Sequence, residues 1–299
     1  MIPQNTQMNK EKLAIANRYE ILILVILLIP LIIYGRRLSW RSPRTNIQEQ
    51  LFPGVVYQRK IFSQPRPYIL HLVAIDLSKP NIKPFVTPPN LNNKNKSNSA
   101  MTTSLFVKKF DLQLGINGSF FSPFKENTPT DFYPKNGDLV DALGENISNR
   151  QRYGRQNQKW NILCFSGSNT ATIAKKSCPI DTVQGIAGNE ILVDSGKSII
   201  GQDTENYSRS AVGIDGKNRL WLIVVDGKQP FYSEGVSLKE LADIFVAIGC
   251  DRALNLDGGG SSTLVMNKLG SIAILNAPTH TKIPMRERPV ANHLGFKLN

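Results

Sequence analysis

The segment Ala253–Val265, ALNLDGGGSSTLV, ends a short apolar run with an acid, three glycines and three hydroxyls. Glycine permits positive φ and a close approach of the backbone to a ligand, so a row of exposed N–H groups here could hold an anion. A glycine-rich turn between two strands explains the glycines alone equally well. The residues that could bind an anion are Gly258, Gly259, Gly260, Ser261 and Ser262, and Asp257 adds a carboxylate beside them.

Several better-known motifs of similar appearance are absent from the sequence. It contains no Gly-x-x-x-x-Gly-Lys-Ser/Thr loop, no Gly-x-Ser-x-Gly elbow and no calcium loop with acids at alternate positions. These absences argue against a nucleotide triphosphatase and an α/β-hydrolase. The three histidines, His71, His280 and His293, are far apart in sequence and lack ligand spacing, so we predict neither a metal site nor a cofactor.

Polar residues also stand beside apolar runs in the stretches GINGSFFSP, YSRSAVGID, RLWLIVVDGK and RERPVANHLGF. Each stretch has an ordinary structural explanation, and a single histidine is more often a buried structural residue than a catalyst. Together with the glycine segment they supply two amides, two arginines, a carboxylate and a histidine. The candidates in them are Asn117, Arg209, Asp226, Arg288, Asn292 and His293.

In this order, the blocks NGSFF, SRSAVGID, VVDGK, LNLDGGGSSTLV and RPVANHLGF resemble the phosphodiester glycosidase family. The resemblance covers about residues 68–299, and LDGGGSS is its most specific element. It implies an α+β domain that hydrolyses the bond between the anomeric carbon of a sugar and a phosphodiester. The sequence departs from the family pattern at Lys228, where relatives often carry arginine.

The resemblance also implies roles for the candidate residues. The glycine backbone, the two serines and the arginines would bind the phosphate, because a guanidinium fits phosphate oxygens with two parallel hydrogen bonds. Asp257 and Asp226 would be the carboxylate pair of a glycosidase, with their separation and hence the stereochemistry left open. His293 would orient a carboxylate or donate to the phosphate. Asn117 and Asn292 would contact the substrate, Asn117 at a sugar hydroxyl.

Two other classes of function remain open from the sequence. A non-catalytic module could use the same glycines, hydroxyls and arginines to bind a sugar phosphate or polysaccharide without cleaving it. A pure binding site has less need of two acids near an anion, since like charges repel, and this favours an enzyme. A membrane-tethered scaffold would not require these polar groups to converge at all.

The elements that must position these residues are mostly short strands. Apolar runs bounded by Gly or Asp-Gly, such as YILHLVAIDL and RLWLIVVDG, predict strands. Helical spacing of apolar residues predicts a helix in SLKELADIFVAIGC, and Thr102 could cap another over residues 101–110. We therefore predict an α+β domain over residues 61–299, a mixed β-sheet with a few flanking helices.

The charge-free run Ile21–Tyr34, ILILVILLIPLIIY, predicts a transmembrane anchor over residues 19–35. We expect a short tail over residues 1–18 and a basic polar tether over residues 36–60. A cleaved signal peptide is the main alternative, although no small-x-small cleavage site follows the run, and a buried core helix is another.

The formal net charge of +13 is concentrated beside this run. Residues 36–109 hold 13 basic and 2 acidic groups, whereas residues 110–299 hold 20 and 19. Because the larger part is nearly neutral, the charge argues against a nucleic-acid partner. The basic residues flanking the run slightly favour a cytoplasmic C-terminal domain. The family resemblance implies instead an extracytoplasmic domain with a role in cell-envelope or exopolysaccharide metabolism, and we adopt that expectation.

Cysteine usage adds one structural expectation. Cys164 and Cys178 flank CFSGSNTATIAKKSC, which predicts a hairpin whose ends could be bridged by a disulfide. Cys250 lies in an apolar segment and is expected to be a buried thiol.

Overall fold

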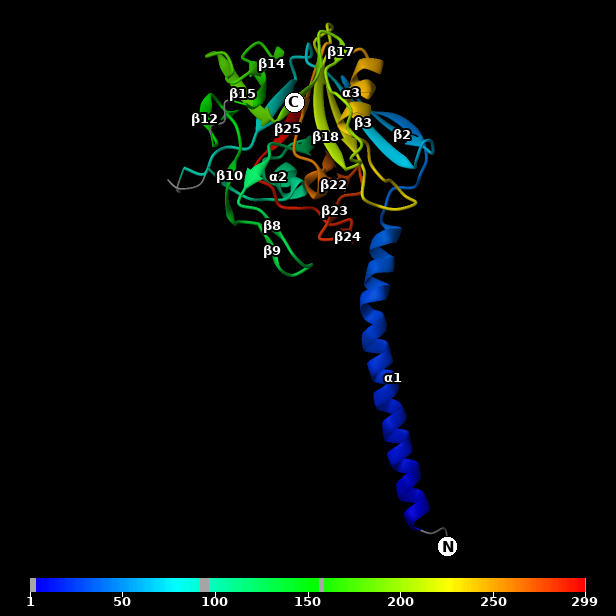
Figure 1. Cartoon of the computed structure of the whole chain (residues 1–299). Helices are drawn as coiled ribbons and strands as arrows, with labels where there is room; N and C mark the ends of the chain where they lie inside the picture. The colour runs from blue at the N-terminus through cyan, green and yellow to red at the C-terminus, as the bar shows by residue number, and fades with distance from the viewer. Residues whose placement is uncertain (1–3, 92–96, 156–158, 299) are drawn as a thin grey trace.

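The computed structural model describes residues 4–91, 97–155 and 159–298 (Figure 1). A long N-terminal helix, α1 (Gln4–Ser39), projects from a domain of several β-sheets with two shorter helices, α2 (Thr103–Lys109) and α3 (Leu238–Ala247). The predicted α+β class, with one apolar helix before a sheet domain, is confirmed. Neighbouring strands in the sheets run antiparallel, and a parallel arrangement occurs at the isolated bridge between Leu143 and Arg155.

The largest sheet leads into the glycine segment and has the order β1-β2-β3-β19-β18-β20-β16-β17. Six of the seven residues of β19 are buried, because α3 covers one face of the sheet and other strands cover the opposite face. Its strands are β1 (Ile47–Phe52), β2 (Val55–Phe62), β3 (Tyr68–Asp76), β16 (Glu190–Asp194), β17 (Lys197–Ser198), β18 (Arg209–Ile214), β19 (Arg219–Val225) and β20 (Arg252–Asn255).

A second sheet, with the order β22-β21-β6-β25-β4, shares the main core with the first. Val73 and Leu222 from the large sheet belong to the same buried cluster as Leu114 and Leu294 from this one. The cluster is continuous, so the two sheets fold as one body. Its strands are β4 (Ile82–Val86), β6 (Leu114–Asn117), β21 (Leu264–Lys268), β22 (Ser271–Ile274) and β25 (His293–Leu298).

A third five-stranded sheet and several two-residue strands complete the domain. The sheet order is β12-β11-β15-β13-β14. Its strands are β11 (Asn146–Ser148), β12 (Gln151–Tyr153), β13 (Asn161–Ser166), β14 (Ala171–Lys175) and β15 (Thr182–Gly188). The remaining strands are β5 (Asn98–Ser99), β7 (Phe121–Ser122), β8 (Lys125–Glu126), β9 (Phe132–Tyr133), β10 (Leu139–Ala142), β23 (Thr279–His280) and β24 (Ile283–Pro284).

Both predicted helices of the domain are confirmed, and each begins at a capping residue. Thr102 accepts a hydrogen bond from the Leu105 N–H at the start of α2. At α3, the Ser237 hydroxyl accepts from the Glu240 N–H, and the Glu240 carboxylate accepts from the Ser237 N–H. These reciprocal bonds satisfy backbone donors that an uncapped helix leaves free.

The N-terminal helix has the length and composition of a membrane span, and the segment after it differs from the expected tether. The window Leu22–Ser39 has a mean hydropathy of 2.0 and is 0% buried, so it is long and apolar enough to cross a membrane and is not a core helix. The helix already begins at Gln4, within the predicted tail of residues 1–18. The predicted tether over residues 36–60 is shorter than expected, because residues 47–62 form the β1–β2 hairpin at the edge of the large sheet.

The cysteine expectations are confirmed. β13 and β14 pair as a hairpin, and Cys164 is bonded to Cys178 with their Cα atoms 5.8 Å apart. Cys250 is buried, and burial raises the pKa of its thiol to about 12. A thiol with so high a pKa is unreactive at neutral pH, so Cys250 has a packing role.

Candidate active site

The glycine loop, Asp257–Thr263, follows β20 and contains a short 3-10 turn over Gly259–Ser261. Asn117, the last residue of β6, fixes the loop at both ends. Its Nδ2 donates to the Asp257 carbonyl at 2.6 Å, and its Oδ1 accepts from the Thr263 N–H at 3.2 Å. Ser210 Oγ donates to the same Oδ1 at 2.7 Å. The amide of Asn117 is thus used to hold the loop, and the sugar contact predicted for it stays a prediction.

The backbone N–H groups of the loop are partly used inside the protein. Gly259 has φ +61° and donates its N–H to the Ser208 carbonyl at 2.8 Å, whereas the Gly258 N–H donates to the Asp257 carboxylate. A Cβ at Gly260 would lie 2.6 Å from Arg288 Nη2 and 3.0 Å from the Thr279 carbonyl. The absence of a side chain at Gly260 therefore lets Arg288 pack against the loop.

Asp257 is 8% exposed, and burial raises the pKa of its carboxyl to about 6. The Ser261 hydroxyl, the Arg288 charge and the Gly258 N–H act in the opposite direction and favour the ionised form. The result is a carboxyl group that is ionised at neutral pH yet basic enough to accept a proton. A pKa close to the working pH is what general acid–base catalysis requires.

Arg288 links Asp257 to a second carboxylate that the sequence analysis missed. Its Nη1 donates to Ser261 Oγ at 3.2 Å, and its Nη2 donates to Glu126 on β8. Hydrogen bonding to His280 and the charge of Arg288 lower the pKa of Glu126 to about 2. Carboxyl groups with pKa values pushed in opposite directions are typical of functional sites, so this cluster is the candidate active site.

A cavity of about 520 Å³ lies against this cluster. Four cationic side chains and one carboxylate line it, so its wall favours an anionic ligand. Among its lining residues, Thr279 carries a buried hydroxyl oxygen that has no hydrogen-bond partner among the described residues. The charged lining residues are Arg41, Glu126, Lys228, Lys282 and Arg288, and the others include Tyr34, Tyr207, Ser208, Gly259, Gly260 and Thr279.

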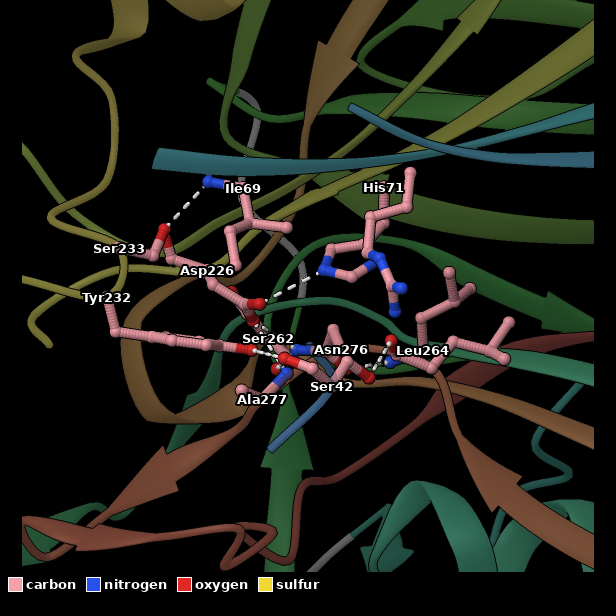
Figure 2. Close-up of polar contacts among 12 residues, drawn as sticks. Ser42, Ile69, His71, Asp226, Tyr232, Ser233, Ser262, Leu264, Asn276 and Ala277 are labelled. Carbon is pink, nitrogen blue, oxygen red and sulfur yellow. Dashed lines mark hydrogen bonds and ion pairs between the residues drawn. The ribbon is translucent and has the colours of Figure 1, made fainter. Parts of the chain in front are cut away.

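Asp226, the second carboxylate predicted from sequence, lies beneath the loop in a closed network (Figure 2). It is 1% exposed, and its Oδ1 accepts from Asn276 Nδ2 at 3.0 Å and from the Ala277 N–H at 2.8 Å. Its Oδ2 lies 3.0 Å from His71 Nε2, and Tyr57 bonds the other ring nitrogen of His71. Because Asn276 also donates to the Ser262 carbonyl, Asp226 supports the loop from behind.

We expect replacement of Asp226 to destabilise the domain. In Asp226→Asn, an amide NH2 group would replace one carboxylate oxygen and would face the donors that now bond to that oxygen. Breaking a buried pair by removing one partner costs about 3 kcal/mol of folding free energy. For a domain of this size, that loss lowers the melting temperature by roughly 10 °C. Thermal unfolding monitored by circular dichroism measures this shift. An unchanged melting temperature, equal to that of the exposed control Asp243→Asn, would contradict the structural role.

His293, at the start of β25, lies in the core. It is fully buried, its ring stacks on Phe106 at 4.6 Å, and its Nδ1 lies 3.1 Å from Thr87 Oγ1. Burial lowers the pKa of the imidazole to about 3, so His293 is neutral at physiological pH. It does not line the cavity, and the predicted role of His293 at a carboxylate or phosphate gains no support from this position.

Arg209 and Asn292 are also held by structural contacts. Arg209 Nε donates to the Val236 carbonyl at 3.1 Å, and its guanidinium faces Asp203 at 3.6 Å. Asn292 Oδ1 accepts from the Ser119 N–H, and its Nδ2 donates to Asn146 Oδ1 at 2.9 Å. Neither residue lines the cavity, and the phosphate and substrate contacts expected of them stay predictions.

Of the residues predicted from sequence, the structure brings together Asp257, the glycine loop, Ser261 and Arg288. Ser262 is buried in the same loop, and its hydroxyl oxygen has no partner among the described residues. Of these, Gly259, Gly260 and Arg288 line the cavity, together with Glu126, Lys228 and Thr279. Asp257 and Ser261 lie behind this lining and are joined to it through Arg288. Glu126 comes from the polar segment KENTPTD, in which no local pattern indicates a site.

Comparison with known sequences places the chain in a family. Residues 110–297, more than half of the chain, match the family model described as phosphodiester glycosidase. N-acetylglucosamine-1-phosphodiester alpha-N-acetylglucosaminidase from Bos taurus is 43% identical over 60 residues, which are 20% of this chain and 11% of that protein. The Homo sapiens enzyme of the same name is 29% identical over 153 residues, with 42% of this chain and 29% of that protein covered. The matches thus span less than a third of either curated relative.

Solved structures agree with this assignment at the level of the fold. The catalytic domain of the zebrafish enzyme of the same name, auto-inhibited by its pro-peptide, superimposes with a TM-score of 0.60 at 19% identity. That match covers 87% of this chain and 86% of the zebrafish domain. A hypothetical protein from Synechocystis has a TM-score of 0.56 at 15% identity, covering 86% of this chain and 64% of its own. On the family-model match over residues 110–297, the chain belongs to the phosphodiester glycosidase family.

Proposed function

We propose that this chain hydrolyses the bond between the anomeric carbon of a sugar and the phosphate of a sugar 1-phosphodiester. The observation that carries the proposal is the arrangement of Asp257, Ser261 and Arg288. They link a carboxyl group of raised pKa to a guanidinium that lines a cationic cavity. The family to which the chain belongs, and the names of the curated relatives, support the same reaction class.

The phosphate of such a substrate would lie against Arg288 and the lysines of the cavity wall. A guanidinium already engaged by Ser261 and Glu126 is held in one orientation, which lowers the entropic cost of binding an anion. The Thr279 hydroxyl oxygen, lacking a protein partner among the described residues, is available to a sugar or phosphate group. Preorganised donors of this kind stabilise the charge that develops on the leaving phosphate.

Asp257 would accept a proton from the attacking water. In the reaction, the water oxygen bonds to the anomeric carbon, the bond from that carbon to the bridging oxygen breaks, and the bond electrons leave with the phosphate. The leaving phosphomonoester needs little protonation, so a base is more useful here than an acid. Glu126 stays ionised and fixes Arg288, which makes it a positioning residue in this proposal.

The activity should depend on the ionisation of Asp257. With the pKa of its carboxyl raised to about 6, the base is protonated and inactive below that pH and becomes active as the pH rises through it. We expect kcat/KM of the free enzyme to fall with decreasing pH below about 6, with Glu126 ionised throughout. A pH profile of kcat/KM measures this. A profile that stays flat to about pH 4, near the ordinary pKa of an aspartate, would show that Asp257 is not the base.

We also propose that the domain acts at a membrane on the extracytoplasmic side, in cell-envelope or exopolysaccharide metabolism. The α1 window could anchor it, and the Cys164–Cys178 disulfide supports an oxidising environment, since disulfides are rare in the cytosol. Labelling of intact cells with a membrane-impermeant reagent at an exposed engineered cysteine, Ile180→Cys, tests the orientation. Protection of that cysteine until the cells are lysed would contradict it.

Hydrolysis itself is tested by incubating the full chain in detergent with a panel of sugar 1-phosphodiesters. We expect release of free sugar and a phosphomonoester in equal amounts. Binding of the panel compounds without turnover would instead support a sugar-phosphate binding module. Release of sugar 1-phosphate and free alcohol would indicate cleavage on the other side of the phosphorus.

A further inference from the structure

The N-terminal helix ends at the candidate active site. Tyr34, on α1, and Arg41, two residues past its end, line the same cavity as Gly260 and Arg288. From Tyr34 to the last helical residue the rise is roughly 7.5 Å. In a chain anchored by the window described above, the mouth of the cavity therefore lies at the level of the lipid headgroups.

The segment after the helix is fixed to the domain, so the cavity cannot move far from the membrane surface. The Tyr232 hydroxyl donates to the Ser42 carbonyl at 2.9 Å (Figure 2), and the Arg41 guanidinium lies over the Tyr232 ring at 4.8 Å. Arg44 donates to the Phe62 carbonyl at 3.0 Å and to the Phe231 carbonyl at 3.1 Å. These contacts join the end of the helix to the large sheet and to the loop after β19.

The face of the domain from which α1 leaves is suited to a membrane surface. Figure 1 shows β8, β9, β23 and β24 on this side of the domain, and residues of β8, β23 and β24 line the cavity. Trp40, directly after the helix, is 56% exposed. Phe231, whose carbonyl accepts from Arg44, is 89% exposed. Aromatic side chains favour the membrane interface, and the cavity lysines, Lys228 and Lys282, favour anionic headgroups.

We propose that the substrate is a sugar 1-phosphate esterified to a membrane lipid alcohol, taken from the leaflet in which the chain is anchored. The inference rests on the proposed function and names its substrate class. The phosphate would lie against Arg288, the sugar would point toward the glycine loop, and the lipid would leave the cavity past Tyr34 and run along α1 into the bilayer. Hydrolysis by water would release free sugar, and the lipid monophosphate would stay in the membrane.

The test uses the full chain in vesicles of phosphatidylcholine and phosphatidylglycerol with two probes. One probe is N-acetylglucosamine 1-phosphate esterified to methanol and dissolved in the buffer. The other carries the same head group esterified to phytanol and incorporated in the same vesicles. At equal bulk concentration we expect the lipid probe to react with a kcat/KM roughly a hundredfold higher, because anchoring both partners in one bilayer raises their effective concentration.

A matched pair of variants separates membrane presentation from chemistry. Phe231→Asn removes the exposed ring, and asparagine tolerates the positive φ of 62° at this position. It should lower turnover of the lipid probe and leave the methanol ester unchanged. The matched variant is Ile180→Asn, at a 97% exposed position in the connection between β14 and β15. Figure 1 shows these two strands on the side of the domain away from α1, so this change should affect neither probe.

The outcomes distinguish the two proposals. Equal kcat/KM for both probes, with no effect of Phe231→Asn, would overturn the lipid substrate and leave the glycosidase intact. Cleavage of neither probe, in a chain that folds and inserts into the vesicles, would overturn the proposed function and the lipid substrate with it.

Discussion

Asp257→Asn is expected to lower kcat on a sugar 1-phosphodiester by about 10²- to 10⁴-fold, the range that a positioned general base contributes. The amide keeps the shape of the carboxyl group and can still bond to Ser261 and to the loop backbone. It cannot accept a proton from water at neutral pH. The melting temperature should change little, because the carboxyl is already partly disfavoured by its burial. Initial rates of sugar release give kcat, and thermal unfolding monitored by circular dichroism gives the melting temperature.

The matched control for this prediction is Asp243→Asn, on the exposed side of α3, where the carboxylate forms a surface ion pair with Lys239. A surface pair contributes little to stability, so this variant should retain wild-type activity. Undiminished turnover by a folded Asp257→Asn protein would remove Asp257 from the mechanism and direct attention to Glu126, the carboxylate that lines the cavity.

Arg288→Gln is expected to lower kcat by about 10²- to 10³-fold, the size of effect seen when one preorganised donor to a developing negative charge is removed. The guanidinium contacts Ser261, Glu126 and the cavity together, and glutamine cannot replace its charge. Arg288→Lys should retain more activity than Arg288→Gln, because it keeps the positive charge but loses the two-pronged geometry. Steady-state kinetics on one soluble phosphodiester measure the series.

Arg286→Gln is the control for this second prediction. Arg286 lies two residues away in the chain, and its Nη1 donates to the Pro129 carbonyl and to Thr281 Oγ1. It does not line the cavity, so its loss should leave kcat near the wild-type value. Equal losses in Arg286→Gln and Arg288→Gln would mean that general positive charge on this face matters, and not a defined phosphate site.

Much of the fold could be predicted from the sequence because its signals are local. In RLWLIVVDG, the apolar residues that predict β19 all lie within that one strand. The capping box and the apolar face of α3 likewise lie within one short segment. The β1–β2 hairpin was missed because it lies at a sheet edge, where β1 exposes four of its six residues and reads as a polar linker. Its burial depends on β3, which no local pattern in residues 47–62 reveals.

Part of the candidate site could also be predicted from the sequence, and part of it depends on the tertiary structure. Asp257 and the glycine loop are adjacent in sequence, so their proximity needed no knowledge of the fold. Asp226 looks equally suited to chemistry in VVDGK, yet its carboxylate is used by His71, Asn276 and Ala277, residues from distant segments. Glu126 shows the converse, because only the tertiary structure brings its two-residue strand against Arg288.

The most direct test of the central claim is to identify which bond the full chain cleaves, by running the reaction in water labelled with heavy oxygen. Attack at the anomeric carbon, as proposed for Asp257 and Arg288, places the label in the released sugar and leaves the phosphomonoester unlabelled. Mass spectrometry of both products gives the answer from one reaction. Label in the phosphate, with the sugar unlabelled, would show attack at phosphorus and would contradict a glycosidase mechanism at this site.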